Sequence, residues 1–310
     1  MRTLICGSLA YDTIMVFKDH FRKHILPEQI HILNVSFLVP DMRREYGGCA
    51  GNIAYNLKLL GGEPVIMATV GDDFGLYRDR LSRLRIASEH IRTVPETYTA
   101  QAFITTDLDD NQITAFHPGA MNFAEQNKVG EARDIRLGII SPDGRAGMLA
   151  HAREFAEAGI PFIFDPGQGL PMFSGAELLD FIRQADYLTV NDYEGKLMEE
   201  RTGRSLAELA RELRALVLTL GGQGSRIYAD GKVYEIPPAR AEAVLDPTGC
   251  GDAYRAGLMH AILNGYDWNT AGRLAGLLGA IKIARRGGQN HRFTPDEIAA
   301  RFLAEYGYGL

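Results

Sequence analysis

Cysteine is scarce in this sequence. It has three, Cys6, Cys49 and Cys250, and no two of them form a Cys-x-x-Cys pair. This spacing argues against a disulfide framework and against a zinc site, and it is typical of a chain kept in a reducing compartment. A chain of 310 residues is long enough to bury a large core without such supports. We therefore predict a cytoplasmic protein.

Long hydrophobic runs are also missing. No stretch of about 18 apolar residues occurs, so we expect no membrane-spanning segment. The first residues, 1–8, carry too short an apolar run for a signal peptide. The formal net charge of −6 argues against nucleic acid or an anionic membrane as a partner. We expect a small-molecule substrate instead.

Several common active-site motifs are absent. There is no Gly-x4-Gly-Lys-Ser/Thr, which argues against a P-loop enzyme, and no Gly-x-Gly-x-x-Gly, which argues against a Rossmann dehydrogenase. There is no Gly-x-Ser-x-Gly nucleophile elbow. His20 and His24 have the spacing of metal ligands on a helix, but no third ligand is near in the sequence. We interpret them as part of a solvated face.

What the chain does have is an alternation of short apolar runs with helical patterns. The runs are continuous, which is typical of strands buried on both faces of a parallel sheet. The alternation predicts an α/β fold, with a doubly wound, mostly parallel sheet sandwiched by helices. The expected strands are residues 3–6, 65–69, 137–141, 162–165, 187–190 and 216–220. The expected helices are residues 52–60, 74–84, 145–158, 176–184, 192–202 and 206–213.

Two regions interrupt this alternation. Residues 16–46 form a long insertion with a loosely alternating run at 30–39. Residues 98–116 hold two β-rich runs, 100–105 and 112–116, around a turn rich in Asp and Asn. We expect both regions to form a small β lid over the active cleft, built from segments of about 13–46 and 98–117. The whole chain, 1–310, is expected to be a single domain that carries this lid.

The most informative segment is residues 246–253, Asp-Pro-Thr-Gly-Cys-Gly-Asp-Ala, which precedes an amphipathic stretch. A glycine-rich turn at a helix N-terminus leaves backbone N–H groups free to bind a phosphate. Gly249 and Gly251 allow close approach of a phosphoryl group. Asp252 follows in the first turn, where it is placed to accept a proton from a substrate hydroxyl. The alternative is an ordinary loop with an acidic N-cap.

Two further turns are candidates for the substrate site. Gly47, Gly48 and Asn52 precede or open an expected helix, where Asn52 could bind a sugar hydroxyl or serve as a plain N-cap. Asp12 lies beyond the first strand, and ligands of open α/β sheets bind at such carboxyl ends. A simple turn aspartate is the alternative for Asp12.

Two turns are candidates for the nucleotide side. Asn191 and Glu194 follow a strand and offer hard oxygen ligands that suit hydrated Mg²⁺, although a helix cap explains them equally well. Thr219, Gly221 and Gly224 also follow a strand. Their glycines permit backbone contact with a nucleotide, or they form a hairpin turn into residues 225–229.

Together, these turns resemble those of the ribokinase-like carbohydrate kinases, also called the phosphofructokinase B family. The resemblance extends over essentially the whole chain. It rests on Gly-Gly-x-x-x-Asn at 47–52, Gly-Asp-Asp-Phe-Gly at 71–75, Asn-x-x-Glu at 191–194, Thr-x-Gly-x-x-Gly at 219–224 and Asp-x-Thr-Gly-x-Gly-Asp at 246–252.

The resemblance implies an ATP-dependent kinase with Asp252 as catalytic base. It implies an anion hole formed by Gly249, Cys250 and Gly251. The implied sugar ligands are Asp12, Gly47, Gly48 and Asn52. The implied nucleotide-side residues are Asn191, Glu194, Thr219, Gly221, Gly224 and Gly287. Glu194 is expected to act on Mg²⁺ mostly through water, and Asp246 and Thr248 belong to a candidate loop for a monovalent cation such as K⁺.

The chain departs from ribokinases in a way that bears on its substrate. Cys49 stands where ribokinases usually have Lys, and the insertion before it is closer to the adenosine-kinase-like and bacterial nucleoside-kinase branch. Apolar walls for a base could come from Phe37, Phe103, Phe116 and Met121, or these could be lid and core packing. We therefore expect phosphorylation of the 5′-hydroxyl of a purine nucleoside such as adenosine, inosine or guanosine. A free-sugar kinase is the alternative, a non-catalytic sensor a distant one, and the protein is expected to be a monomer or a homodimer.

Overall fold

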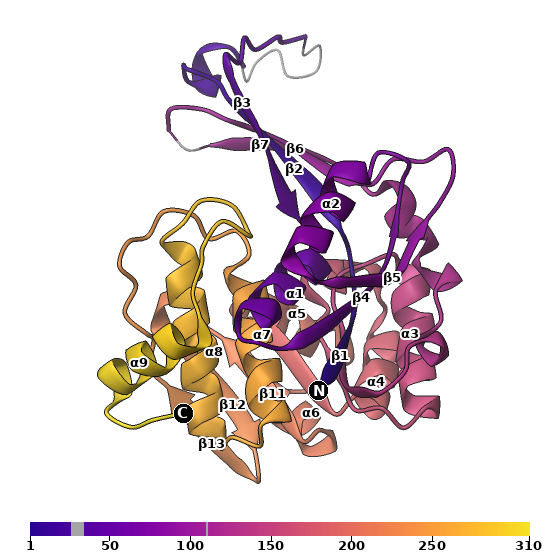
Figure 1. Cartoon of the computed structure of the whole chain (residues 1–310), viewed down its shortest axis with the longest axis vertical. Coiled ribbons are helices and arrows are strands. Elements are labelled where there is room, and N and C mark those ends of the chain that lie inside the picture. Colours follow the sequence, from indigo (N-terminus) through magenta and orange to yellow (C-terminus); the bar gives the residue numbers. More distant parts are fainter. Residues whose placement is uncertain (26–33, 110) are drawn as a thin grey trace.

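The computed structural model describes residues 1–25, 34–109 and 111–310. Within these residues the main sheet has nine strands. The strand order is β13-β12-β11-β10-β9-β8-β1-β4-β5, parallel from β11 to β5 and antiparallel at the β12–β13 edge (Figure 1). The bounds are β1 Arg2–Cys6, β4 Glu63–Val70, β5 Ala87–Thr93, β8 Ile135–Ile140, β9 Phe162–Phe164, β10 Tyr187–Asn191, β11 Ala215–Thr219, β12 Ser225–Ala229 and β13 Lys232–Ile236.

Helices cover both faces of this sheet, and each face has its own hydrophobic core. One core lies against helices α1, α2, α7, α8 and α9, and the other against α3 to α6. The predicted doubly wound α/β fold is confirmed. The bounds are α1 Cys49–Leu59, α2 Gly75–Leu84, α3 Arg145–Glu157, α4 Gly175–Gln184, α5 Asp192–Thr202, α6 Leu206–Leu209, α7 Cys250–Leu263, α8 Trp268–Ile283 and α9 Pro295–Tyr306.

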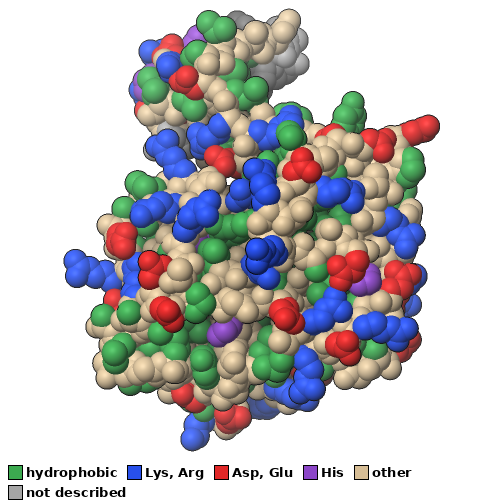
Figure 2. All heavy atoms as spheres, viewed as in Figure 1, with side chains coloured by type: hydrophobic (Ala, Val, Ile, Leu, Met, Phe, Trp, Pro, Cys, Tyr) green, Lys and Arg blue, Asp and Glu red, His purple; other side chains and the backbone are tan. Residues whose placement is uncertain are grey.

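A second sheet stands away from the first and is built from the segments predicted to form a lid, so we refer to it as the lid (Figure 1). Its order is β3-β2-β6-β7, with β2 parallel to β6 and the other pairs antiparallel. In the space-filling view the lid protrudes from the body of the molecule (Figure 2). The bounds are β2 Ala10–Val16, β3 Asp41–Gly47, β6 Ala100–Thr106 and β7 Gln112–His117.

The six strands predicted in the main sheet and the two predicted at 100–105 and 112–116 are all present. The strand predicted at 30–39 is wrong for residues 34–39, which have no strand structure, and residues 30–33 lie outside the described residues. The lid strand of this region is β3 instead. Its sequence, Asp-Met-Arg-Arg-Glu-Tyr-Gly, shows no clear alternation of apolar and polar residues, because both faces of this strand are partly exposed.

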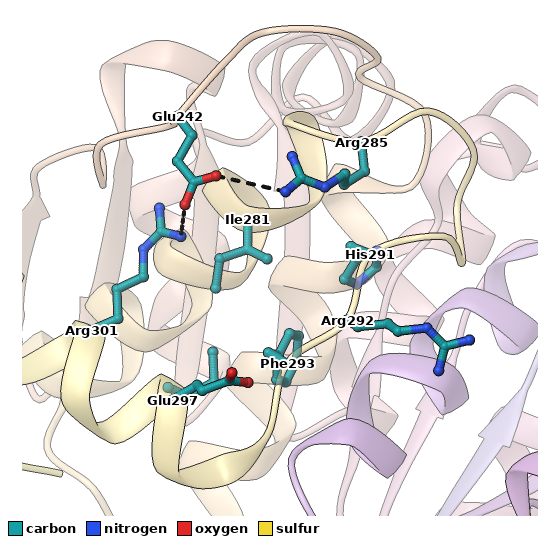
Figure 3. Close-up of a pocket in the computed structure, with 9 residues that line it drawn as sticks. Glu242, Ile281, Arg285, His291, Arg292, Phe293, Glu297 and Arg301 are labelled. Carbon is teal, nitrogen blue, oxygen red and sulfur yellow. Dashed lines mark hydrogen bonds and ion pairs between the residues drawn. The ribbon is translucent and has the colours of Figure 1, made fainter.

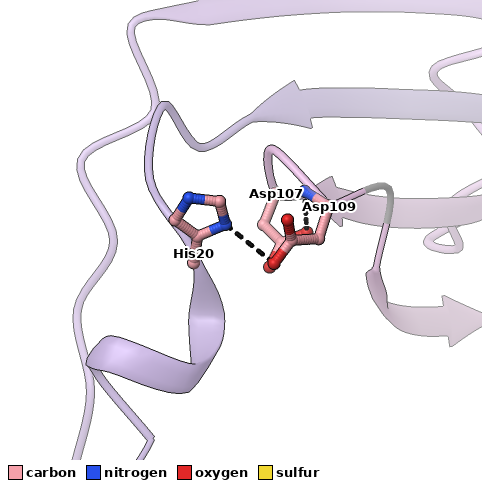
Figure 4. Close-up of side chains that lie close together, drawn as sticks. All are labelled: His20, Asp107 and Asp109. Atoms are coloured by element: carbon pink, nitrogen blue, oxygen red, sulfur yellow. Dashed lines mark hydrogen bonds and ion pairs between the residues drawn. The ribbon is translucent and has the colours of Figure 1, made fainter.

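A network of hydrogen bonds joins two lid segments near His20 (Figure 4). His20 Nδ1 lies 2.8 Å from Asp109 Oδ2. Asp107 Oδ2 accepts from the Phe21 amide at 2.9 Å, and its Oδ1 accepts from the amides of Asp109 and Asn111. Since the Asp107 carboxylate is engaged by backbone donors, we interpret this cluster as a structural tie.

Across the described ranges, no helix is long and apolar enough to cross a membrane.

Candidate active site

Residues 246–252, which we call the catalytic turn after the role that the sequence predicts for them, lead into the N-terminus of α7. Gly249 has a φ of 77°, a left-handed conformation that favours glycine. Among the described residues, no acceptor bonds the amides of Gly249, Gly251 and Asp252. The Cys250 amide, which we expected in the anion hole, donates to Pro247 O at 3.1 Å. The amides available to an anion are therefore those on either side of Cys250.

Asp252 is held by a residue from a distant part of the chain. Asn52 Nδ2 donates to Asp252 Oδ2 at 2.8 Å, and Asn52 Oδ1 accepts from Gln289 at 3.2 Å. Burial raises the pKa of Asp252 to about 6, although the bond from Asn52 and the charge of Arg255 oppose the rise. Such a pKa is suited to a general base near neutral pH. Asn52 thus positions the candidate base, in addition to its predicted place beside the sugar.

Asp12 and the two glycines of residues 47–48 form one side of the same site. A Cβ at Gly47 would lie 2.4 Å from Asp12 Oδ2. Gly48 has a φ of 84°, and a Cβ there would lie 2.5 Å from the carbonyl oxygen of Ser8. Burial and the charge of Asp252 raise the pKa of Asp12 to about 6. The two carboxyl groups therefore act on each other electrostatically across the site.

A cavity of about 680 Å³ opens between these residues and the lid. Phe116 and Met121 line it, as predicted for apolar walls. Phe103 does not, because its neighbours Ala102 and Ile104 line the cavity and alternate residues of a strand face opposite sides. Phe37 packs against Phe17 and Phe21 in the lid, with ring centroids 4.8 and 5.0 Å apart.

Asp143 is a cavity residue that the sequence analysis missed. It lies just beyond β8, is 2% exposed and lines the cavity. Its Oδ1 accepts from the Gly144 amide at 2.9 Å, whereas its buried Oδ2 has no partner in the part of the chain that is described. Burial and the nearby charge of Glu125 raise the pKa of Asp143 to about 8. No motif marks this residue; its position beyond a predicted strand end was the available signal.

A second cavity, of about 310 Å³, lies on the other side of the catalytic turn. Thr219, Gly221 and Gly224 line it, as predicted for the nucleotide side. Gly224 also serves the β11–β12 hairpin, where its carbonyl oxygen accepts from the Leu220 amide at 2.8 Å, and a Cβ there would lie 2.1 Å from Ile236 O of β13. Cys250 and Gly251 line this cavity, while Gly249 and Asp252 line the larger one. The two cavities therefore adjoin at the catalytic turn.

Asn191 and Glu194 form the helix cap that the sequence left open as an alternative. Asn191 Oδ1 accepts from the Glu194 amide, and Glu194 Oε2 accepts from the Asn191 amide, both at 2.8 Å. Burial and the negative charge of Asp165 raise the pKa of Glu194. A cation near Glu194 would stabilise its ionised form, so this carboxylate fits a role beside Mg²⁺.

Asp246, Thr248 and Gly287 lie together beside the catalytic turn. Asp246 Oδ1 accepts from the Thr248 amide at 2.9 Å, and its Oδ2 accepts from the Gly287 amide at 2.8 Å. Gly287 does not line the nucleotide cavity. Its contact with Asp246 makes it a support of the catalytic turn in this structure.

A buried ion pair beneath the site was also missed by the sequence analysis. Arg255 Nη2 lies 2.8 Å from Asp165 Oδ1, and their side chains are 7% and 3% exposed. Arg255 follows Asp252 by one helical turn. Its charge opposes the rise in the pKa of Asp252. Arg255 therefore belongs to the electrostatic environment of Asp252. Nothing in the sequence distinguishes it from an ordinary helix residue, because its contact with Asp165 joins distant parts of the chain.

A smaller cavity, of about 240 Å³, lies away from the catalytic turn against α8 and α9 (Figure 3). Glu242 lies 3.1 Å from Arg301 and 3.8 Å from Arg285. These charges are thus already paired with one another, and no predicted site residue lines this cavity.

Comparison with known families agrees with this geometry. A model described as "pfkB family carbohydrate kinase" matches residues 12–295. The chain belongs to this family. It is therefore an ATP-dependent phosphotransferase, as the motifs predicted.

The family includes well-matched relatives. A Burkholderia thailandensis nucleoside kinase, solved in complex with inosine, is 55% identical, with a TM-score of 0.90 and 99% of each chain covered. The same protein has been solved with ADP-inosine. A nucleoside kinase of Methanothermobacter thermautotrophicus is 34% identical over 98% of this chain and 96% of its own length. One of Methanocaldococcus jannaschii is 32% identical over 86% of this chain and 89% of its own length.

Proposed function

We propose that this protein is a ribonucleoside kinase that transfers the γ-phosphoryl group of ATP to the 5′-hydroxyl of its substrate. The observation that carries the proposal is the catalytic turn, where two cavities adjoin with free amides and Asp252 between them. The relatives named nucleoside kinases support the substrate class.

The residues of the site divide the chemistry between them. Asp252 accepts the proton of the 5′-hydroxyl, and Asn52 fixes the carboxylate that does so. The amides of Gly249, Gly251 and Asp252 stabilise negative charge on the transferring phosphoryl group. Phosphoryl transfer has a loose transition state, so positioning and charge stabilisation supply most of the catalysis. Asp12 is placed to accept hydrogen bonds from ribose hydroxyls.

The magnesium site belongs to the same proposal. Glu194 retains one carboxylate oxygen outside its helix-cap bond, and burial beside Asp165 favours a nearby cation. Mg²⁺ usually keeps several waters and binds through few protein groups. When bound, it neutralises charge on the phosphates of ATP.

The cavity favours a neutral substrate with a base over a phosphorylated sugar. Arg43, which precedes the sugar motif, pairs with Glu45 at 3.4 Å. The Arg44 guanidinium lies over the Tyr11 ring, 5.2 Å from its centroid. Neither arginine lines the acceptor cavity. With Phe116 and Met121 as walls, a purine base fits this environment better than a second phosphate does.

An acceptor screen tests this proposal. ADP release is measured with adenosine, inosine, guanosine, cytidine, ribose, fructose and fructose 6-phosphate, each at a range of concentrations. We expect a purine nucleoside to have the highest kcat/KM, because stacking of a base adds about 1–3 kcal/mol of binding. Highest turnover of a free or phosphorylated sugar would replace the nucleoside assignment with the free-sugar one. Binding without turnover would favour the sensor. Cytoplasmic location and a monomeric or homodimeric state stay predictions.

A further inference from the structure

Lys282 is a buried lysine whose ammonium group binds backbone oxygens beside the catalytic turn. It lies in the last turn of α8, and its exposed fraction is 0%. Its Nζ donates to the carbonyl oxygen of Asp246 at 2.7 Å and to that of Arg285 at 3.0 Å. Burying an ammonium group is costly unless it is hydrogen-bonded or paired. The hydrogen bonds to the two carbonyl oxygens offset this cost, and they place a positive charge beside the catalytic turn.

The two carbonyl groups belong to two segments that hold the catalytic turn in place. The amides of Leu245 and Asp246 both donate to Ile283 O, at 2.9 and 3.2 Å. The Gly287 amide donates to the Asp246 carboxylate at 2.8 Å. Lys282 adds a charged connection between the same segments. Asp246 lies six positions before Asp252, so a shift of this segment would move the amides of the anion hole.

Converging carbonyl oxygens are the ligands that K⁺ takes in proteins, where they replace its water shell. Here the carbonyl oxygens of Asp246 and Arg285 accept from an ammonium group of the same charge. A K⁺ ion bound by these two oxygens would compete with Lys282 for its hydrogen bonds and its position. The residues present therefore do not fit a separate monovalent cation at this point, although the sequence made the loop a candidate for one.

We propose that Lys282 is an internal replacement for a monovalent cation, and that phosphoryl transfer by this protein is consequently independent of K⁺. This inference rests on the proposed phosphotransfer function. Lys282 is a positioning residue: it does not contact the substrate but holds the carbonyl groups that orient the anion hole. Its charge also lies on the side of the turn where Asp246 and Asp252 contribute negative charge.

The cation dependence of the wild-type protein is the first test. Initial rates are measured with the best substrate of the acceptor screen and Mg²⁺-ATP, in tetramethylammonium buffers with or without KCl, at matched ionic strength. We expect kcat to change by less than about twofold. An increase of more than about fivefold on addition of K⁺ would overturn the proposal. This test needs no variant, and it differs from failure of the proposed function, in which no acceptor is turned over.

The second test is chemical rescue of Lys282→Met, which keeps an unbranched side chain one atom shorter and removes the charge. We expect kcat to fall about 10- to 100-fold in tetramethylammonium buffer. This loss is smaller than the loss of about 10²–10³-fold that removal of an oxyanion-hole donor typically causes. Added NH₄⁺ or K⁺ is expected to restore at least part of kcat in a saturable manner, with a smaller change in nucleoside KM.

A merely structural lysine would give a different result. If Lys282→Met folds, as judged by circular dichroism, and is inactive without rescue by any small cation, the internal-cation role is wrong. Full activity without added cations would contradict it equally. The control is Lys232→Met, which removes an exposed lysine of β13. Lys232 begins this strand, at the opposite end from Ile236, which lines the cavity beside the catalytic turn. It is expected to leave kcat unchanged and to respond to no cation.

Discussion

Asp252 has the protonation behaviour expected of a base that works near neutral pH. Its pKa is raised to about 6 because it is buried, so it is mostly ionised at pH 7 and becomes protonated below pH 6. Only the ionised form accepts the proton of the substrate. Asp12, whose pKa is also raised to about 6, interacts with it, so the two carboxyl groups titrate as a pair.

We therefore predict that kcat/KM falls as pH decreases below about 6, which a pH-rate profile measures. In Asp252→Asn, kcat at pH 7.5 is expected to fall by about 10²–10⁴-fold. Removal of that charge also lowers the pKa of Asp12, so the remaining acidic limb moves to lower pH. Near-native turnover of the variant would contradict the assignment of Asp252 as base.

Asp143 offers a test of base recognition. A buried oxygen that has no partner among the described residues is suited to bind a polar atom of the substrate, and loss of such a bond costs about 1–3 kcal/mol. We predict that Asp143→Leu raises KM for the preferred nucleoside by about tenfold or more. Asp143→Asn, which keeps a polar group, is expected to change it by less than about threefold. An equal effect of Asp143→Leu on ribose and nucleoside would place Asp143 away from the base.

The buried Arg255–Asp165 ion pair is expected to contribute to the stability of the fold. Removing one partner of a buried pair leaves an uncompensated charge. We predict that Arg255→Met lowers the free energy of unfolding by about 3–5 kcal/mol, measured by urea denaturation. The control is Arg226→Met, which breaks the exposed Arg226–Glu235 pair on β12 and β13 at a similar distance of 2.9 Å. Its cost is expected to stay below about 1 kcal/mol, and equal costs would contradict the role of burial.

At the scale of the elements, glycine turns place the site residues, and two of these glycines have a positive φ of similar size. Gly48 and Gly61 have nearly the same φ, 84° and 81°. A Cβ at Gly48 would lie 2.5 Å from Ser8 O, whereas at Gly61 its nearest neighbour would be 3.7 Å away. Both positions have a positive φ that favours glycine, but Gly48, with a ψ of 140°, lies outside the left-handed helical region and also clashes with the segment that carries Asp12.

We predict that Gly61→Ala lowers the free energy of unfolding by about 1–2 kcal/mol and leaves kcat/KM unchanged. Gly48→Ala is expected to cost more, and to lower kcat/KM for the acceptor more than for ATP, because the clash displaces the sugar side of the site. Urea denaturation and steady-state kinetics measure the two effects. Equal losses of kcat/KM in both variants would contradict the role of Gly48 in placing the sugar side of the site.

The elements also show why some of the structure could be predicted and some could not. Buried parallel strands are continuous apolar runs, so β1, β4 and β8 were found from the sequence. The turns rich in glycine and acidic residues predicted several residues that line the two cavities, including Asp252 and Thr219. The strand β3 was missed because neither face is fully buried. Asp143 and Lys282 were missed because their roles depend on burial and on contacts between distant segments, which no local pattern encodes.

At the scale of the whole molecule, the acceptor cavity belongs partly to the main sheet and partly to the lid. The lid strands contribute Ala102, Ile104, Thr114 and Phe116, and the body contributes Asp12 and Asp252. Phe116 is 50% exposed and Ile104 is partly exposed, so a bound substrate can bury more of their apolar surface. A substrate that fills the cavity would contact both parts and draw them together, which excludes water from the phosphoryl group.

We predict that a saturating nucleoside slows amide hydrogen exchange in β6 and β7. We expect slower exchange in β3 as well, because it belongs to the same sheet and would move with it on closure. ATP alone is expected to have a smaller effect there, since its cavity lies on the other side of the catalytic turn and is lined by no lid strand. The hairpin β12–β13 serves as the internal reference: nucleoside is expected to leave its exchange unchanged. Unchanged exchange throughout the lid in the presence of a nucleoside that is turned over would mean that closure is not coupled to substrate binding. Equal slowing in the lid and in β12–β13 would indicate general stabilisation by the ligand, because closure acts on the lid sheet alone.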